Sequence, residues 1–132
     1  MPTTREVPST VTRWHEAAAG QDPAALDDLL AEDAVFHSPA VHTPQRGKAI
    51  TTAYLSAAFA VLGPTLEYHR EWYADGSAVL EFTADLDGTF VQGVDMFEWG
   101  PDGRITDFTV MVRPVKGLQA LMALMASRLQ VS

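Results

Sequence analysis

Cysteine is absent from the 132-residue sequence, which excludes disulfide bridges, zinc sites with cysteine ligands and catalysis by a thiol. Basic residues are few, since nine Lys and Arg stand against 17 Asp and Glu and give a formal net charge of -8. Nucleic acids and anionic membrane surfaces bind patches of Lys and Arg, so this balance argues against both as partners. A small apolar molecule is the partner that we expect.

Long hydrophobic runs are also absent, because no segment approaches the roughly 20 apolar residues that span a bilayer. Residues 1–8 lack the apolar stretch of a signal peptide, and we expect them to form a disordered lead to a cytoplasmic protein. With 47% hydrophobic residues the chain can form one core. We therefore predict a single domain over residues 1–132.

The first 30 residues have the pattern of two short helices. Ser9 or Thr10 can cap the first helix, and Gly20 can end it. Asp22 followed by Pro23 is typical of the start of a second helix. The inward faces of the two helices are formed by Val11, Trp14, His15 and Ala18, and by Leu26, Leu29 and Leu30. Together they predict a helical hairpin at the N-terminus.

A long helix is predicted in the middle of the sequence. The β-prone run 34–38 ends at Pro39, and the segment SPAVHTPQRG that follows has two prolines and a glycine that predict an irregular loop. Residues 48–62 are apolar on more than one side, which indicates a helix buried against a sheet, and Gly63-Pro64 ends it. A loop of about ten residues at this point suggests a functional role.

Four strands are predicted in the second half, at residues 66–73, 78–86, 89–99 and 104–114. Asp75-Gly76, Asp87-Gly88 and the segment GPDG separate them, and these turn signals favour consecutive antiparallel hairpins. Apolar and polar residues alternate most clearly in the second strand, so one face of the sheet is packed and the other faces water.

The outer face of this sheet carries apolar residues that a solvated face would lack. They are Phe90, Val94, Met96 and Met111. Either a second copy of the chain or the C-terminal helix could cover them. That helix is predicted from the stripe Leu118, Leu121, Met122, Met125 and Leu129. A homodimer through the outer sheet face is the arrangement that we favour.

Asp95 stands in the opposite row of the third strand, with Val91, Phe97 and Trp99. An unpaired charge among apolar side chains is costly, so this carboxyl must be paired, protonated or functional. The functional interpretation is an acid with a raised pKa at the polar end of an apolar pocket. The structural interpretation is a carboxylate held by Trp14 Nε1, by a histidine or by the backbone. Both interpretations stay open at this stage.

Three motifs extend over nearly the whole chain: LLAEDAVFHSP, RGKAI and GVDMFEWGPDGRITDFTVMVRP. With the order of elements, they resemble the SnoaL-like branch of the nuclear transport factor 2-like superfamily, which includes ketosteroid isomerases, limonene epoxide hydrolases and polyketide cyclases. The resemblance implies an α+β fold, a cone-shaped barrel in which a curved antiparallel sheet wraps around the long helix and leaves an apolar pocket. It also implies dimers through the convex sheet face.

The resemblance places Asp95 at the position of the isomerase acid, which stays protonated and donates a hydrogen bond to a developing oxyanion. Ser38 stands where the isomerases have their proton-abstracting carboxylate, and Trp14 where they have a tyrosine, so their mechanism does not carry over as a whole. In the epoxide hydrolases an Arg-x-Asp pattern corresponds to Gly93-Val94-Asp95, and a second acid falls near Val110. Two charged groups of that mechanism are therefore missing.

Three further residues are candidates for the chemistry. A histidine beside an acid with a raised pKa can transfer protons near neutral pH, which makes His37 and His42 candidate bases. His37 points outward by strand alternation and could instead bond its neighbouring backbone, and His42 could be a solvated loop residue. Ser38 precedes Pro39 and is favoured as a turn-capping hydroxyl over a nucleophile.

The pocket walls are predicted from the large side chains near the core, because in this fold the core lines the cavity. They are Trp14, His15, Phe36, Tyr54, Phe59, Phe82, Phe97, Trp99, Phe108 and Val110. The four histidines lack a metal-binding spacing, so neither a metal nor a cofactor is expected. We predict an isomerase, cyclase or hydrolase with a small-molecule pocket and Asp95 as its acid. The alternatives are a non-catalytic binding protein and a dimeric interaction module.

Overall fold

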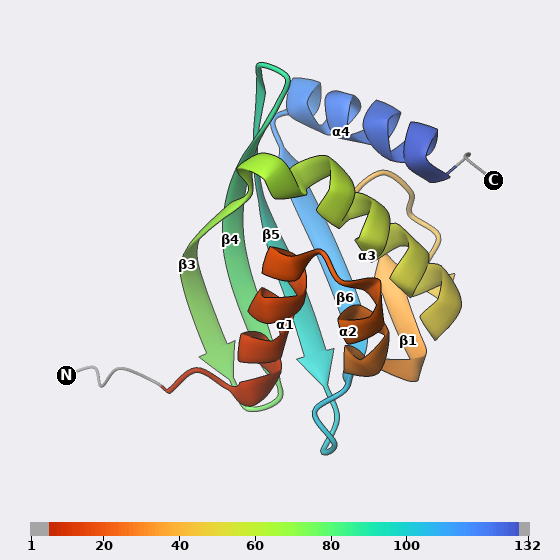
Figure 1. Ribbon diagram of the computed structural model, residues 1–132, viewed down its shortest axis with the longest axis vertical. Coiled ribbons are helices and arrows are strands. Elements are labelled where there is room, and N and C mark those ends of the chain that lie inside the picture. The colour runs from red at the N-terminus through yellow and green to blue at the C-terminus, as the bar shows by residue number, and fades with distance from the viewer. Residues whose placement is uncertain (1–5, 130–132) are drawn as a thin grey trace.

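The computed structural model describes residues 6–129, which form four α-helices and a six-stranded sheet (Figure 1). The helices are α1 (Ser9–Gly20), α2 (Pro23–Leu29), α3 (Lys48–Leu62) and α4 (Val115–Leu129). The strands are β1 (Leu30–His37), β2 (Gln45–Arg46), β3 (Glu67–Ala74), β4 (Ser77–Leu86), β5 (Thr89–Trp99) and β6 (Ile105–Arg113). Residues 1–5 of the expected disordered lead lie outside the described residues, and residues 6–8 form neither helix nor strand.

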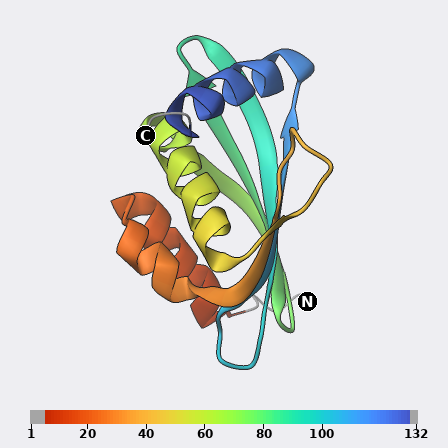
Figure 2. The same cartoon turned by 90° about the vertical axis from the view of Figure 1, so that its right-hand side faces the viewer.

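The strands form one sheet in the order β2-β1-β6-β5-β4-β3. β3 to β6 are consecutive antiparallel hairpins as predicted, and Gly76, Gly88 and Gly103 adopt the positive φ angles that their turns require. β1 runs parallel to β6, a pairing that the turn signals could not reveal, so the sheet is mixed. It is strongly curved and does not close, and the helices lie on its concave side (Figure 2).

The predicted helical hairpin is present, but the ends of α1 are made differently. Pro8 occupies the N-cap position, and no side chain caps the helix. The Thr10 hydroxyl instead donates a hydrogen bond to the carbonyl oxygen of Gly103 at 2.8 Å. At the other end Gln21, and not Gly20, adopts the left-handed conformation. The start of α1 is therefore tied to the β5–β6 turn, which holds the helix against the sheet.

The loop after β1 is more regular than its prolines suggested. Gln45 and Arg46 form β2 and pair with Phe36 and Val35 of β1. The prediction of a wholly irregular loop was wrong here, because neither residue is a proline and both can enter a ladder. The next element, α3, spans the predicted residues Lys48–Leu62.

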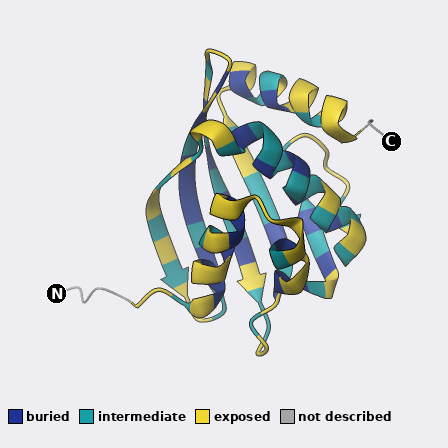
Figure 3. Ribbon diagram, viewed as in Figure 1, coloured by how far each residue is buried: buried dark blue, intermediate teal, exposed yellow. Residues whose placement is uncertain are grey.

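The core lies between the concave face of the sheet and the helices (Figure 3). Its largest fully buried side chains include Trp14, Phe97 and Phe108, and the ring centroids of Trp14 and Phe108 are 4.7 Å apart. On β5 the inward row is the predicted one, because Val91, Asp95 and Phe97 are all buried. The alternation of β5 thus places a carboxyl inside an aromatic core.

α4 packs on α3 and on the concave side of β5 and β6, so it does not cover the outer sheet face as one alternative had it. Gly117 permits a close approach to β5, since a Cβ atom there would lie 2.6 Å from Val91 Cγ1. The outer face stays open, and Trp72, Phe90 and Met111 are each more than half exposed on it. None of the helices in residues 6–129 combines the length and apolar character that a membrane crossing requires.

Candidate functional site

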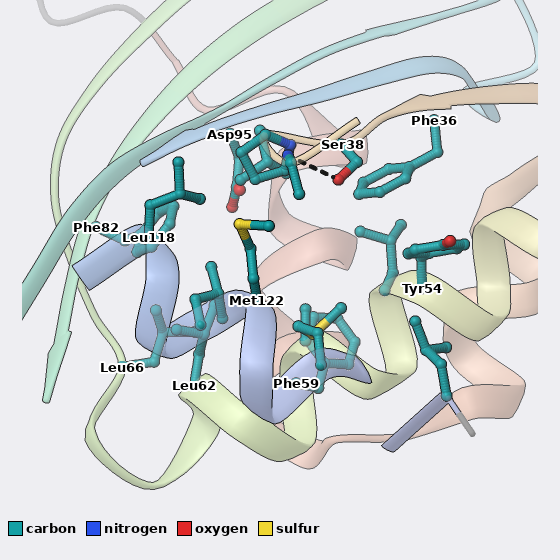
Figure 4. A pocket seen from close by; sticks show the side chains of 18 of the residues that line it. Phe36, Ser38, Tyr54, Phe59, Leu62, Leu66, Phe82, Asp95, Leu118 and Met122 are labelled. Atoms are coloured by element: carbon teal, nitrogen blue, oxygen red, sulfur yellow. Dashed lines mark hydrogen bonds between the residues drawn. The ribbon is translucent and has the colours of Figure 1, made fainter. Parts of the chain in front are cut away.

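A cavity of about 380 Å³ lies between the concave sheet face, α3 and α4 (Figure 4). Its walls from α1, the sheet and the loops include Trp14, Phe36, Ser38, Pro39, Val41, Leu66, Tyr68, Phe82, Asp95 and Val110. Its walls from the helices α3 and α4 include Tyr54, Leu55, Phe59, Leu62, Leu118, Leu121, Met122, Met125 and Leu129. The apolar stripe of α4 therefore faces the cavity.

Few side chains of this lining are polar. Among the described residues, the ionisable ones that line the cavity are Asp95, Tyr54 and Tyr68, and no lysine, arginine or histidine joins them. An anionic ligand would find no counter-ion there, and burial of an unpaired charge is costly. The lining suits a neutral, mainly apolar molecule with one polar group near Asp95.

Asp95 lies in the middle of β5, opposite Leu80 of β4 and Val110 of β6. The residue is only 5% exposed. Burial raises the pKa of its carboxyl to about 7, because the charged form loses its hydration, and a hydrogen bond from Tyr68 acts in the opposite direction. Near neutral pH this carboxyl can therefore be present as the neutral acid.

A chain of hydrogen bonds holds Asp95. Trp14 Nε1 donates to the Tyr68 hydroxyl oxygen at 2.9 Å, and the Tyr68 hydroxyl donates to Asp95 Oδ2 at 2.7 Å. The structural interpretation had Trp14 bonded to Asp95 directly, but Tyr68 stands between them. Asp95 Oδ1 has no hydrogen-bond partner among the described residues, and Asp95 belongs to the cavity lining. One carboxyl oxygen is anchored, and the other is available to a ligand.

Tyr68 did not emerge from the sequence analysis. In the structure Tyr68 pairs with Phe82 and so shares the inward face of the sheet, and the signal for this in the sequence would be the alternation of β3. The β-bulge between Tyr68 and Glu71 obscured that signal, since a bulge shifts the alternation by one residue. Alternation counted back from Trp72, which is exposed on the outer face, would place Tyr68 on the wrong side.

The structure does not bring the two candidate histidine bases to Asp95. His37 Nε2 lies 3.1 Å from Asp107 Oδ2, and neither residue lines the cavity. His42 is exposed in the loop. Ser38 does line the cavity, and its Oγ accepts a hydrogen bond from the backbone N–H of Ala40, as expected of a turn residue (Figure 4).

Some of the predicted walls lie behind the cavity surface. Those that line it are Trp14, Phe36, Tyr54, Phe59, Phe82 and Val110, whereas Phe97, Trp99, Phe108 and His15 lie outside the lining. His15 packs edge-on against Tyr68 with ring centroids 4.7 Å apart, and its Nε2 lies 2.6 Å from Glu71 Oε2. In residues 6–129 no three His, Asp or Glu side chains are grouped so that they could hold a metal ion.

The sequence matches a known protein family, and the structure matches solved structures over most of its length. A family model described as the SnoaL-like domain matches residues 11–108. A steroid delta-isomerase from Pseudomonas aeruginosa has a TM-score of 0.87 and 41% sequence identity, over 92% of this chain and 89% of its own. An uncharacterized protein with a cystatin-like fold from Silicibacter pomeroyi has a TM-score of 0.87 and 29% identity, over 93% and 86%.

A solved structure with lower sequence identity has the same fold. A putative polyketide cyclase from Sinorhizobium meliloti has a TM-score of 0.64 and 20% identity, over 80% of this chain and 95% of its own. At this identity the match shows a shared fold. No curated protein matches the sequence.

Proposed function

The chain belongs to the SnoaL-like domain family, and from this premise we propose that it is a cofactor-independent enzyme of the isomerase, cyclase or hydrolase kind. Its substrate is a small, neutral, apolar molecule with an oxygen that accepts a hydrogen bond from Asp95. The observation that carries this proposal is a buried carboxyl at a mainly apolar cavity surface, with one oxygen free of protein partners among the described residues.

The chemistry follows from that free oxygen. When Asp95 is neutral, its O–H can donate to a substrate oxygen and stabilise the negative charge that develops there during isomerisation or ring closure. Ser38 also lines the cavity, but a hydroxyl without an activating group cannot abstract a proton at neutral pH. Among the described residues the lining therefore holds no second carboxyl and no histidine that could act as the base while Asp95 is the acid.

The volume of the cavity limits the size of the substrate. A cavity of about 150 Å³ holds one benzene ring. The volume of about 380 Å³ therefore suits a skeleton of two to three six-membered rings or a branched chain of similar bulk. The similarity to a steroid delta-isomerase supports an apolar polycyclic ketone within this class.

The experiment uses compounds that share one such skeleton: an unsaturated ketone, an epoxide, the parent hydrocarbon and a carboxylate. We expect the ketone or the epoxide to raise Tm most, because each offers an oxygen to Asp95, and the carboxylate to leave Tm unchanged. Product formation followed by NMR in D₂O tests the reaction itself. Equal stabilisation by the hydrocarbon would show that Asp95 does not recognise the ligand.

A non-catalytic binding protein is the second candidate, and one observation favours it. Among the described residues Asp95 is the single carboxyl of the cavity lining, so a separate acid and base are not both in place. This candidate predicts stabilisation by the ketone with full recovery of unaltered compound after long incubation. Turnover in the same experiment decides for the enzyme.

We also propose that two copies of the chain associate through the outer sheet face, where Trp72, Phe90 and Met111 are exposed. Met111→Glu should convert the dimer to a monomer, because it places a charge in an apolar contact. The matched control is Leu124→Glu, which replaces an exposed apolar residue of α4 that does not line the cavity. Light scattering after size-exclusion chromatography measures both. An unchanged mass for Met111→Glu, with function retained, would exclude this face as an interface.

A further inference from the structure

We propose that Tyr68 is a positioning residue that determines which oxygen of Asp95 carries the acid proton. By donating to Oδ2, the Tyr68 hydroxyl directs the proton of the neutral carboxyl to Oδ1, the oxygen that is free toward the cavity. The catalytic consequence rests on the proposed function, whereas the effect on Asp95 itself does not.

The direction of the hydrogen bonds carries this inference. An indole N–H can only donate a hydrogen bond, so Trp14 is the donor and the Tyr68 hydroxyl oxygen is the acceptor. A phenol has a single proton to donate, and Tyr68 donates it to Asp95 Oδ2, with 2.7 Å between the two oxygen atoms. The chain therefore runs one way, from Trp14 through Tyr68 to Asp95. Acceptance by Tyr68 from Trp14 also strengthens the bond that Tyr68 donates.

The neutral carboxyl has two forms, which differ in the oxygen that carries the proton. An oxygen that already accepts a strong hydrogen bond acts as the carbonyl oxygen, so the proton is favoured on the other one. In Asp95 that other oxygen is Oδ1. Without Tyr68 the carboxyl could rotate and place its proton on either oxygen, including the one that faces the protein.

The groups around Tyr68 keep it a donor. Burial raises the pKa of its hydroxyl well above the usual value, and the negative charges of Asp95 and Glu71 act in the same direction. Glu71 in turn accepts hydrogen bonds from the Tyr73 hydroxyl and from His15, which packs on the Tyr68 ring. Among the described residues α3 and α4 bring no charged side chain to the cavity.

The test is Tyr68→Phe, which removes the hydroxyl and keeps the ring that packs on His15 and Phe82. The pKa of Asp95 is read from the carbon-13 shift of its carboxyl, with Asp95→Asn to assign the signal. Since the lost hydrogen bond favours the charged form, we expect the pKa of Asp95 to rise by about one unit. Should this variant fail to fold, Tyr68→Met removes the same hydroxyl and carries the same prediction.

Tyr73→Phe is the matched control, because it removes a hydroxyl from the same strand, and that hydroxyl bonds Glu71 and not Asp95. This variant should leave the pKa of Asp95 unchanged. With a substrate in hand, Tyr68→Phe should lower kcat about tenfold with a smaller change in KM, and move the alkaline limb of the pH profile upward with the pKa of Asp95. An Asp95 titration that does not move in Tyr68→Phe overturns the proposal. That readout needs no turnover, so it stands even if Asp95 proves not to be catalytic.

Discussion

Asp95→Asn should lower turnover by about 10²–10⁴-fold, the usual contribution of a positioned general acid. Asparagine keeps the size of the side chain, and its carbonyl oxygen can still accept the hydrogen bond from Tyr68. Its amide can direct an N–H to the cavity in place of the O–H, but it cannot transfer a proton. The measurement is kcat and kcat/KM for the compound that the ketone and epoxide panel identifies. The fold is checked by circular dichroism.

The control for this substitution lies on the same strand. Glu98 is exposed in the outer row of β5, so Glu98→Gln removes a carboxylate of similar sequence context without touching the cavity. Its turnover should stay within about twofold of the parent, as is usual for surface changes. Unchanged turnover in Asp95→Asn would remove Asp95 from the mechanism and leave binding as the role of the cavity.

The placement of Asp95 could be predicted because it depends on local regularity alone. The side chains of β5 alternate between the two faces over eleven residues, and its pairing with β4 has no bulge. The inward row of Val91, Asp95 and Phe97 can therefore be counted from the sequence. The turns at Gly76 and Gly88 fix the order of β3, β4 and β5 in the same local way. The buried row, and with it the acid, follows.

The partners of Asp95 could not be predicted in this way. Tyr68 lies 27 residues from Asp95 in sequence, and β4 separates their strands in the sheet. The Tyr68 hydroxyl and Asp95 Oδ2 meet across β4 at 2.7 Å, and this contact depends on the bulge, curvature and packing of the sheet, which no periodicity records. The partner of His37 could not be predicted either, because strand alternation turns its side chain outward but only the register of β1 and β6 places it beside Asp107.

The position of α4 shows a further limit of pattern analysis. Its stripe of leucine and methionine predicts an apolar face, but the stripe fits the outer sheet face and the cavity equally well. The choice depends on Gly117, where the absence of a side chain lets α4 approach Val91 on the concave side. The closure of the cavity by α4 therefore depends on tertiary packing and cannot be predicted from the helix pattern alone.

The free energy of unfolding should fall by about 4 kcal/mol between pH 4 and pH 8 through Asp95 alone. The pKa of this carboxyl is about 7 in the folded protein, against 3.8 for an unperturbed aspartate. Between these values the folded state holds a proton that the unfolded state has lost, so stability decreases as pH rises, by about 1.4 kcal/mol per unit. The stabilising contribution is fully present below about pH 4 and is lost as pH rises through about 7.

Asp95→Asn isolates this contribution, because asparagine does not titrate. The difference in unfolding free energy between the two proteins, measured by urea denaturation at each pH, should move in favour of the variant by about 4 kcal/mol from pH 4 to pH 8. Hydrogen bonds from Arg70 and Gln92 hold the pKa of Glu81 at about 2, so its titration falls at lower pH and is common to both proteins. A difference that stays constant over this range would mean that Asp95 is ionised and fully paired in the fold, and the neutral acid on which the catalytic proposal depends would be absent.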